Sequence, residues 1–131
     1  MSIQSLKSIL ILDAITCAGI FLIALLAAAP IASLLGLPVI VVTLAGWICL
    51  ASAALMAVVA TQQPPSAALT KLIVAGNLGW VAASFAVLAA CAGQMTAIGI
   101  ALVIAQAFAV LLFAFLEARG AGALGRVAAV S

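Results

Sequence analysis

The stretch TAIGIALVIAQAFAVLLFAFLE, residues 96–117, decides the class of this protein. It carries no charged residue before its last position, Glu117, and a helix needs about 20 mostly apolar residues to cross the hydrocarbon core of a bilayer. Three further runs of this kind precede it, over residues 8–29, 38–61 and 66–92. The sequence therefore predicts an all-α fold, a transmembrane four-helix bundle.

The composition of the whole chain agrees with four membrane spans. Of its 131 residues, 70% are hydrophobic and only 5% are charged, whereas a soluble domain is about a quarter charged. So few charges cannot cover a water-facing surface. We therefore expect residues 1–131 to form a single integral membrane domain whose main partner is the lipid bilayer. The net charge of +2 argues against nucleic acid as a partner, because such binding needs several phosphate contacts.

The helix-breaking residues fall at or between the ends of the four runs. A proline lacks the backbone N–H that a helix interior needs, and all four prolines lie in such places: Pro30, Pro38, Pro64 and Pro65. We expect the first helix to end at Pro30. The stretch PIASLLGLP, residues 30–38, is too short to span and is expected to form an apolar turn or a short helix at the interface.

Helix start and stop signals refine these boundaries. Ser66 and Thr96 are expected N-caps of the third and fourth helices, and Gly93 and Gly120 are expected C-terminal stops. Residues 119–131 then form a flexible tail.

The basic residues set the expected orientation. Four spans place the N-terminus, the second loop and the C-terminus on one side, and every basic residue falls there: Lys7, Lys71, Arg119 and Arg126. The positive-inside rule then predicts cytoplasmic termini in a bacterial inner membrane. A cleaved signal peptide beginning MSIQSLK is the alternative, but its apolar run contains Asp13 and is longer than the roughly 7–15 residues usual for such peptides.

One acidic residue lies clearly inside a span. Asp13 follows Lys7 by six residues, and Asn77 follows Lys71 by the same number. At 1.5 Å per residue, each side chain lies about 9 Å deeper than its lysine. An amide can donate to a carboxyl group, so we expect Asn77 to bind Asp13.

Further polar residues extend this pair into a candidate site. Asn77, Trp80 and Ser84 share one helical face, which we expect to meet the first span, and Gly76 and Gly79 let a neighbouring helix come close. The complete candidate site comprises Asp13, Thr16, Asn77, Trp80, Ser84 and Gln106. Two interpretations stay open. The residues are hydrogen-bonding glue between helices, or Asp13 takes up and releases a proton.

The remaining reactive residues give no catalytic or metal-binding pattern. The chain has no histidine, and its three cysteines, Cys17, Cys49 and Cys91, form no CxxC motif. We interpret the cysteines as packing residues and expect no metal, no cofactor and no enzyme activity. Glu117 and Arg119 come at the end of the last run, where we expect both to be solvated.

The layout resembles a group of small bacterial four-helix integral membrane proteins. The resembling features are LILDAITC (residues 10–17), LLGLP (34–38), NLGWVAASFAVL (77–88) and the run 96–117. The resemblance implies the fold and gives no activity.

The chain is also similar in layout to the small multidrug resistance transporters. Those proteins are short, have four spans, and carry an acidic residue in the first span and a tryptophan in the third. Asp13 and Trp80 match these two positions. The chain departs from that pattern in having aspartate instead of glutamate, no tyrosine, and basic residues that favour a single orientation.

Two functions follow as expectations. The first is an accessory or binding protein that acts through helix packing with a partner protein, with a second copy of itself or with a lipid-like ligand. The alternative is a proton-coupled transporter of a small lipophilic or cationic solute. In that mechanism Asp13 exchanges a proton for the solute, Asn77 orients it, and Trp80 offers its ring face to a cation.

Overall fold

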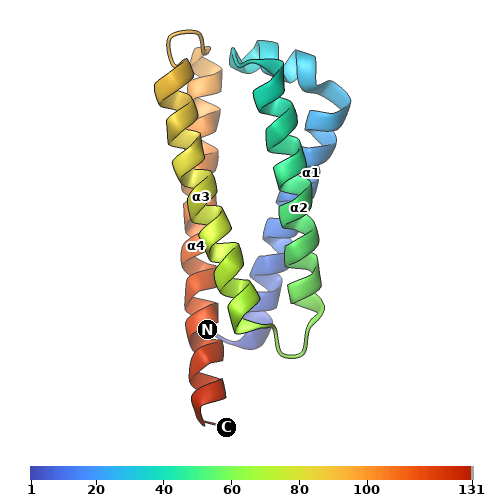
Figure 1. Ribbon diagram of the computed structural model, residues 1–131, viewed down its shortest axis with the longest axis vertical. Coiled ribbons are helices and arrows are strands. Elements are labelled where there is room, and N and C mark those ends of the chain that lie inside the picture. The colour runs from blue at the N-terminus through green and yellow to red at the C-terminus, as the bar shows by residue number, and fades with distance from the viewer. Residues whose placement is uncertain (131) are drawn as a thin grey trace.

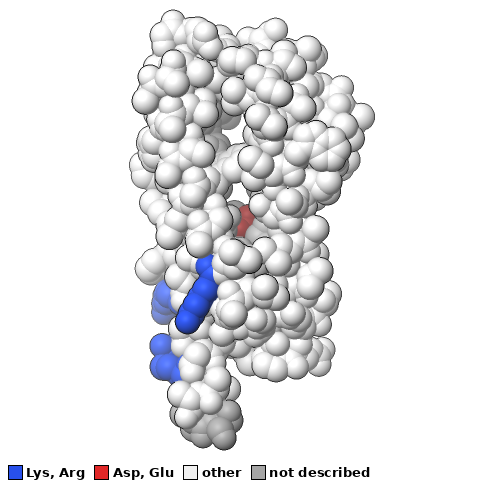
Figure 2. Space-filling view, in the orientation of Figure 1, with Lys and Arg blue, Asp and Glu red and all other residues white. Residues whose placement is uncertain are grey.

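The computed structural model describes residues 1–130 as four helices (Figure 1). They are α1 (Ile3–Leu35), α2 (Val39–Thr61), α3 (Ala67–Cys91) and α4 (Ala97–Val130). Each helix contains a stretch that is long and apolar enough to cross a membrane. The predicted all-α, four-span fold is therefore confirmed. The start of α1 and the end of α4 lie at the same end of the bundle (Figure 1), which we call the basic end because Lys and Arg side chains gather there (Figure 2).

Helix α1 continues past the proline that we expected to end it. Ala27 has φ −142° and ψ 39°, outside the helical region, and the helix then resumes through Pro30 to Leu35. Proline cannot donate to the carbonyl four residues earlier, so it bends a helix at that point. The prediction of an end at Pro30 is wrong, whereas the short helix expected within residues 30–38 is present as the last part of α1. Gly36, with φ 72°, ends it.

Helix α4 continues past the predicted stop at Gly120. Its segment 119–130, where we expected a flexible tail, is helical. Ala121 and Leu124 are buried there, and Gly120 lies against the side chain of Leu6 in α1. This packing between helices stabilises the extension. At 1.5 Å per residue, α4 is about 50 Å long and exceeds the roughly 30 Å hydrocarbon core.

The two predicted N-caps are confirmed. The Ser66 hydroxyl accepts a hydrogen bond from the backbone N–H of Leu69 at 3.2 Å. The Thr96 hydroxyl accepts one from the backbone N–H of Gly99 at 2.9 Å. Each bond satisfies one of the free donors in the first turn of a helix.

The four helices associate as two hairpins. α1 packs along α2 and α3 packs along α4, while α1 and α4 join the hairpins and α2 and α3 hardly touch. A cluster of buried residues joins the hairpins at the basic end: Leu6, Leu10, Ala14, Met56, Val59, Ala60, Ile73 and Leu124. The second cluster, Ala24, Ala32 and Val42, belongs to α1 and α2 alone. The hairpins consequently diverge away from the basic end (Figure 1).

A clasp rejoins the hairpins at the far end. Thr96 donates its backbone N–H to the Leu35 carbonyl at 3.1 Å and its hydroxyl to the Leu34 carbonyl at 2.7 Å. Gly99 allows this approach, since a Cβ there would collide with the Leu35 carbonyl group. Between clasp and core, Figure 2 shows an opening between α2 and α3, which we call the side opening.

Candidate intramembrane acid site

The contact that the lysine spacing predicted is present. Asn77 of α3 donates from Nδ2 to Asp13 Oδ2 of α1 at 3.0 Å. Both side chains are buried, with 2% of Asp13 and 8% of Asn77 exposed. This bond joins the two hairpins.

A second carboxyl group binds the same amide nitrogen. Asn77 Nδ2 also donates to Glu117 Oε2 of α4 at 2.9 Å. Glu117 is 0% exposed, so the prediction that it is solvated is wrong. α4 continues beyond Glu117 and packs on α1, and this position therefore lies within the bundle instead of at its edge.

The two carboxyl groups form an acid pair, defined here as Asp13 and Glu117. They lie close together, because Asn77 Nδ2 donates to both, to Asp13 at 3.0 Å and to Glu117 at 2.9 Å. Both Asp13 oxygens have donors, because the Cys17 thiol lies 3.8 Å from Oδ1 and Asn77 binds Oδ2. Glu117 is less well satisfied, since its Oε1 is buried and has no hydrogen-bond partner.

No basic side chain neutralises the acid pair within residues 1–130. Lys7 and Lys71 each lie six residues toward the basic end, and the Arg119 guanidinium carbon lies 5.9 Å above the Phe115 ring. Figure 2 shows acidic atoms at the lower end of the side opening, above the Lys and Arg side chains. These atoms belong to the acid pair, because Asp13 and Glu117 are the only acidic residues of the chain.

The other predicted polar residues of α3 meet α4 instead of the first helix. Trp80 donates its indole N–H to Gln106 Oε1 at 2.6 Å. Gln106 donates in turn to the Ser84 hydroxyl at 2.8 Å and to the Val103 carbonyl at 2.9 Å, and Ser84 donates to the Trp80 carbonyl at 2.8 Å. This polar link joins α3 and α4 about three helical turns from Glu117 along α4.

Two expectations about neighbouring residues are wrong. Thr16 is exposed and donates its hydroxyl to the Leu12 carbonyl at 2.9 Å, so it takes no part in the site. A Cβ at Gly76 or Gly79 would meet nothing within 4 Å. These two glycines therefore face outward and accommodate no other helix within the described part of this chain.

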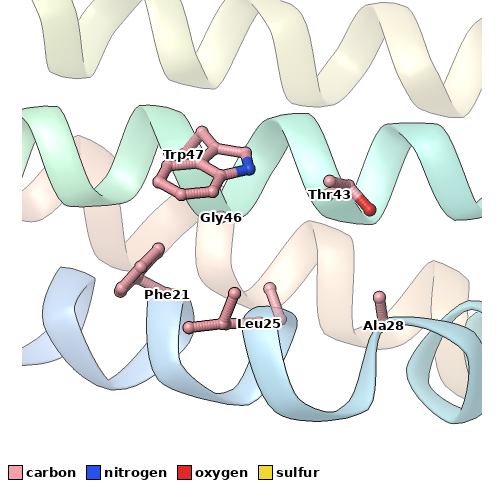
Figure 3. Close-up of a pocket in the computed structure, with 7 residues that line it drawn as sticks. Phe21, Leu25, Ala28, Thr43, Gly46 and Trp47 are labelled. Atoms are coloured by element: carbon pink, nitrogen blue, oxygen red, sulfur yellow. The ribbon is translucent and has the colours of Figure 1, made fainter.

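A separate apolar hollow lies between α1 and α2 (Figure 3). Phe21 of α1 and Trp47 of α2, whose ring centroids are 5.3 Å apart, both line it. The hydroxyl group in its lining, on Thr43, donates to the Val39 carbonyl at 3.0 Å. The hollow therefore offers packing to an apolar group and no reactive chemistry.

A sequence signal for Glu117 exists. Ala107, Ala114 and Ala121 repeat every seven residues and are all buried, and Glu117 comes three residues after the second of them, where a heptad places another inward position. Gln106 precedes Glu117 by eleven residues, which corresponds to about three helical turns. This spacing places both polar side chains on the face that meets α3.

The described residues contain no group of three or more His, Cys, Asp or Glu side chains that could hold a metal ion. What remains is two carboxyl groups, an amide and a thiol, a set suited to binding protons or cations through hydrogen bonds. Comparison with family models, curated proteins and solved structures finds no match to this chain.

Proposed function

We propose that this protein is a proton-coupled transporter of a small lipophilic or cationic solute, and that Asp13, Asn77 and Glu117 form its exchange site. One observation carries the proposal. Two carboxyl groups from opposite hairpins bind a single amide nitrogen inside an apolar bundle, with no basic partner among the described residues. Ionisable residues inside a membrane mark ion and proton pathways by default.

Electrostatics explains why such a pair exchanges ions. Two negative charges this close, away from water, repel strongly, because Coulomb energy rises as the dielectric constant falls. The acid pair is therefore stable when it holds a proton or a cation and unstable when it holds neither. Binding one releases the other, which is the coupling that an exchanger requires.

The two-hairpin architecture supports a route to the site. Asp13 belongs to one hairpin and Glu117 to the other, and the side opening reaches the acid pair (Figure 2). Rocking of two bundles about a central site exposes it to each side in turn in many transporters. Here α2 and α3 make only sparse contact, so movement of the hairpins would have to rearrange the core at the basic end and the clasp at the far end and would break little between α2 and α3.

The charge distribution supports an inner-membrane location with cytoplasmic termini. Lys7 and Lys71 lie in the first turns of α1 and α3, and Arg119 and Arg126 lie in the last part of α4, at the end of the bundle where α1 begins (Figure 1). Basic residues are retained on the cytoplasmic side during insertion.

Transport is tested in vesicles that contain the purified chain and the pH-sensitive dye pyranine. Two probes of similar size that are both cationic at neutral pH are added outside, benzamidinium and phenyltrimethylammonium. We expect at least one to drive proton movement that Asp13→Asn abolishes and Thr16→Ala preserves, since Thr16 lies outside the site. Flux that survives in folded Asp13→Asn, or no flux of either probe, contradicts the proposal.

An accessory role, through packing with a partner protein, a second copy or a lipid-like ligand, is the second candidate. The observation that favours it is the bare outer face of α3, where Gly76 and Gly79 have no neighbour among the described residues. α3 also has the least buried apolar window of the four helices. Native mass spectrometry of protein extracted gently from its membrane tests this role, which predicts a bound subunit or lipid of defined mass.

A further inference from the structure

Glu117 Oε1 is the one buried side-chain nitrogen or oxygen atom in the described chain that lacks a hydrogen-bond partner. Its companion Oε2 binds Asn77, and the Asp13 carboxyl beside it already has two donors, from Cys17 and Asn77. A buried acceptor without a donor is destabilising. A ligand that stabilises this site must therefore bring Glu117 Oε1 a hydrogen-bond donor, because a second acceptor would leave it unsatisfied.

The chemistry of the pair restricts what that donor is. An ionised carboxylate only accepts hydrogen bonds, so two carboxyl groups that share one amide nitrogen cannot satisfy each other unless a hydrogen lies between them. A proton on one carboxyl group supplies it. An N–H group that carries positive charge supplies the same hydrogen bond, and charge-assisted bonds of this kind are the stronger ones.

We propose that the solute is an organic cation bearing N–H groups, such as a protonated amine or an amidinium, and that it donates to Glu117 Oε1 in place of the proton. This inference rests on the exchange function proposed above and names its solute class. A quaternary ammonium ion carries the same charge but no N–H, so it leaves Oε1 unsatisfied. Glu117 is thus the residue that selects the solute.

The exchange balances in charge. With one proton, the acid pair carries a single net negative charge. A monovalent N–H cation enters, the proton leaves, and the occupied site again carries a single net negative charge. The other groups at the site, the Cys17 thiol and the Asn77 amide, are neutral, and the Cys49 thiol lies beside Cys17. Lys7 and Lys71 remain toward the basic end.

The solute enters by separation of the hairpins, because Glu117 is fully buried in this structure. Its charged group then lies between α1 and α4, where the acid pair meets, and its apolar part extends into the side opening between α2 and α3 (Figure 2). α2 and α3 contain no acidic residue, and their one charged residue, Lys71, lies toward the basic end, so the opening suits an aromatic or alkyl group.

Calorimetry on the full chain in detergent tests this solute class. Benzamidinium and phenyltrimethylammonium are titrated in two buffers whose ionisation enthalpies differ, so that the heats report proton release. We expect benzamidinium to bind at least about tenfold more tightly, as a charge-assisted hydrogen bond implies, and to release about one proton. In Glu117→Gln the preference should fall to less than about twofold, whereas Thr16→Ala should keep it.

Equal affinity for the two probes, no proton release, or a preference that survives Glu117→Gln would each overturn the inference. The comparison of probes in the unchanged protein stands even if Glu117→Gln fails to fold. The result is also distinct from the transport test. Coupled flux of phenyltrimethylammonium without preference refutes the solute class alone, whereas selective benzamidinium binding without flux refutes transport alone.

Discussion

Gln106 and Glu117 lie three turns apart on one face of α4, and each accepts a hydrogen bond from a different side chain of α3. Trp80 binds Gln106 at 2.6 Å and Asn77 binds Glu117 at 2.9 Å. α3 and α4 are therefore joined at two depths, whereas the polar bridge from this hairpin to α1 within the site is the one bond to Asp13. This difference predicts a firm α3–α4 hairpin and a weaker joint between hairpins.

Trp80→Phe should destabilise the fold by about 1–2 kcal/mol, because it leaves the half-buried Gln106 oxygen without its donor. Trp47 provides the matched control, since it is 52% exposed and contacts Phe21 through its ring. Trp47→Phe should cost less than about 0.5 kcal/mol. Unfolding by sodium dodecyl sulfate, followed by circular dichroism, measures the free energy of unfolding of both variants. An equal decrease in the two variants would refute the proposed α3–α4 link.

Asn77→Ala should cost about 1–3 kcal/mol, because both carboxyl groups lose a shared donor. In a Glu117→Gln background the same change should cost at least about 0.5 kcal/mol less, since the amide introduced by that substitution can itself donate to Asp13. The same unfolding assay on the four proteins of this double-mutant cycle measures the coupling. Strict additivity would show that Asn77 does not act on the two acids together.

Gly99→Ala should open the clasp at the far end. Its Cβ would collide with the Leu35 carbonyl group, and overpacking of this kind costs about 1–3 kcal/mol. At Gly125 a Cβ meets nothing within 4 Å. Gly125→Ala should therefore raise the free energy of unfolding by about 0.5–1 kcal/mol, because alanine favours the helix more than glycine does. Thermal unfolding in detergent compares the two, and a neutral Gly99→Ala would argue against the clasp.

The orientation is testable with single cysteines in a chain whose Cys17, Cys49 and Cys91 are replaced by alanine. Gly93→Cys lies in the turn between α3 and α4, and Gly125→Cys lies near the opposite end of α4. With cytoplasmic termini, a membrane-impermeant maleimide should label position 93 in intact cells and position 125 only after permeabilisation. Labelling of position 125 in intact cells, and of position 93 only after permeabilisation, would show the opposite orientation.

The length of the apolar runs was sufficient to predict the four spans, and local spacing was sufficient to predict the contact between Asp13 and Asn77. Both residues follow a lysine by six positions on helices that start from the same side, so their depths agree without any knowledge of packing. The partner of Trp80 and Ser84 could not be read in the same way. A helical face can be recognised in a sequence, but the helix that it meets depends on how the hairpins associate.

Glu117 was missed because its neighbourhood resembles the end of a helix. Arg119 and Gly120 follow it closely, and such residues usually mark a solvated terminus. The helix continues because Leu124, about two turns further on, joins a core cluster that includes Leu6, which lies near the opposite end of the chain. The prediction that the first helix ends at Pro30 was wrong because a bend at Ala27 allows the helix to continue through the proline.

The distance along the chain between Asp13 and its donor has a consequence for biosynthesis. Asn77 is synthesised 64 positions after Asp13, so the first hairpin is made before the amide that will bind its carboxyl group exists. Insertion of an aspartate at the middle of a span costs about 2.5–3.5 kcal/mol, and here the Cys17 thiol of the same helix is in place early, whereas the amide donor arrives only with the second hairpin. A chain that stops early therefore keeps an acid that lacks its amide donor. The same carboxyl group that binds Asn77 in the folded protein therefore distinguishes an incomplete chain from a complete one.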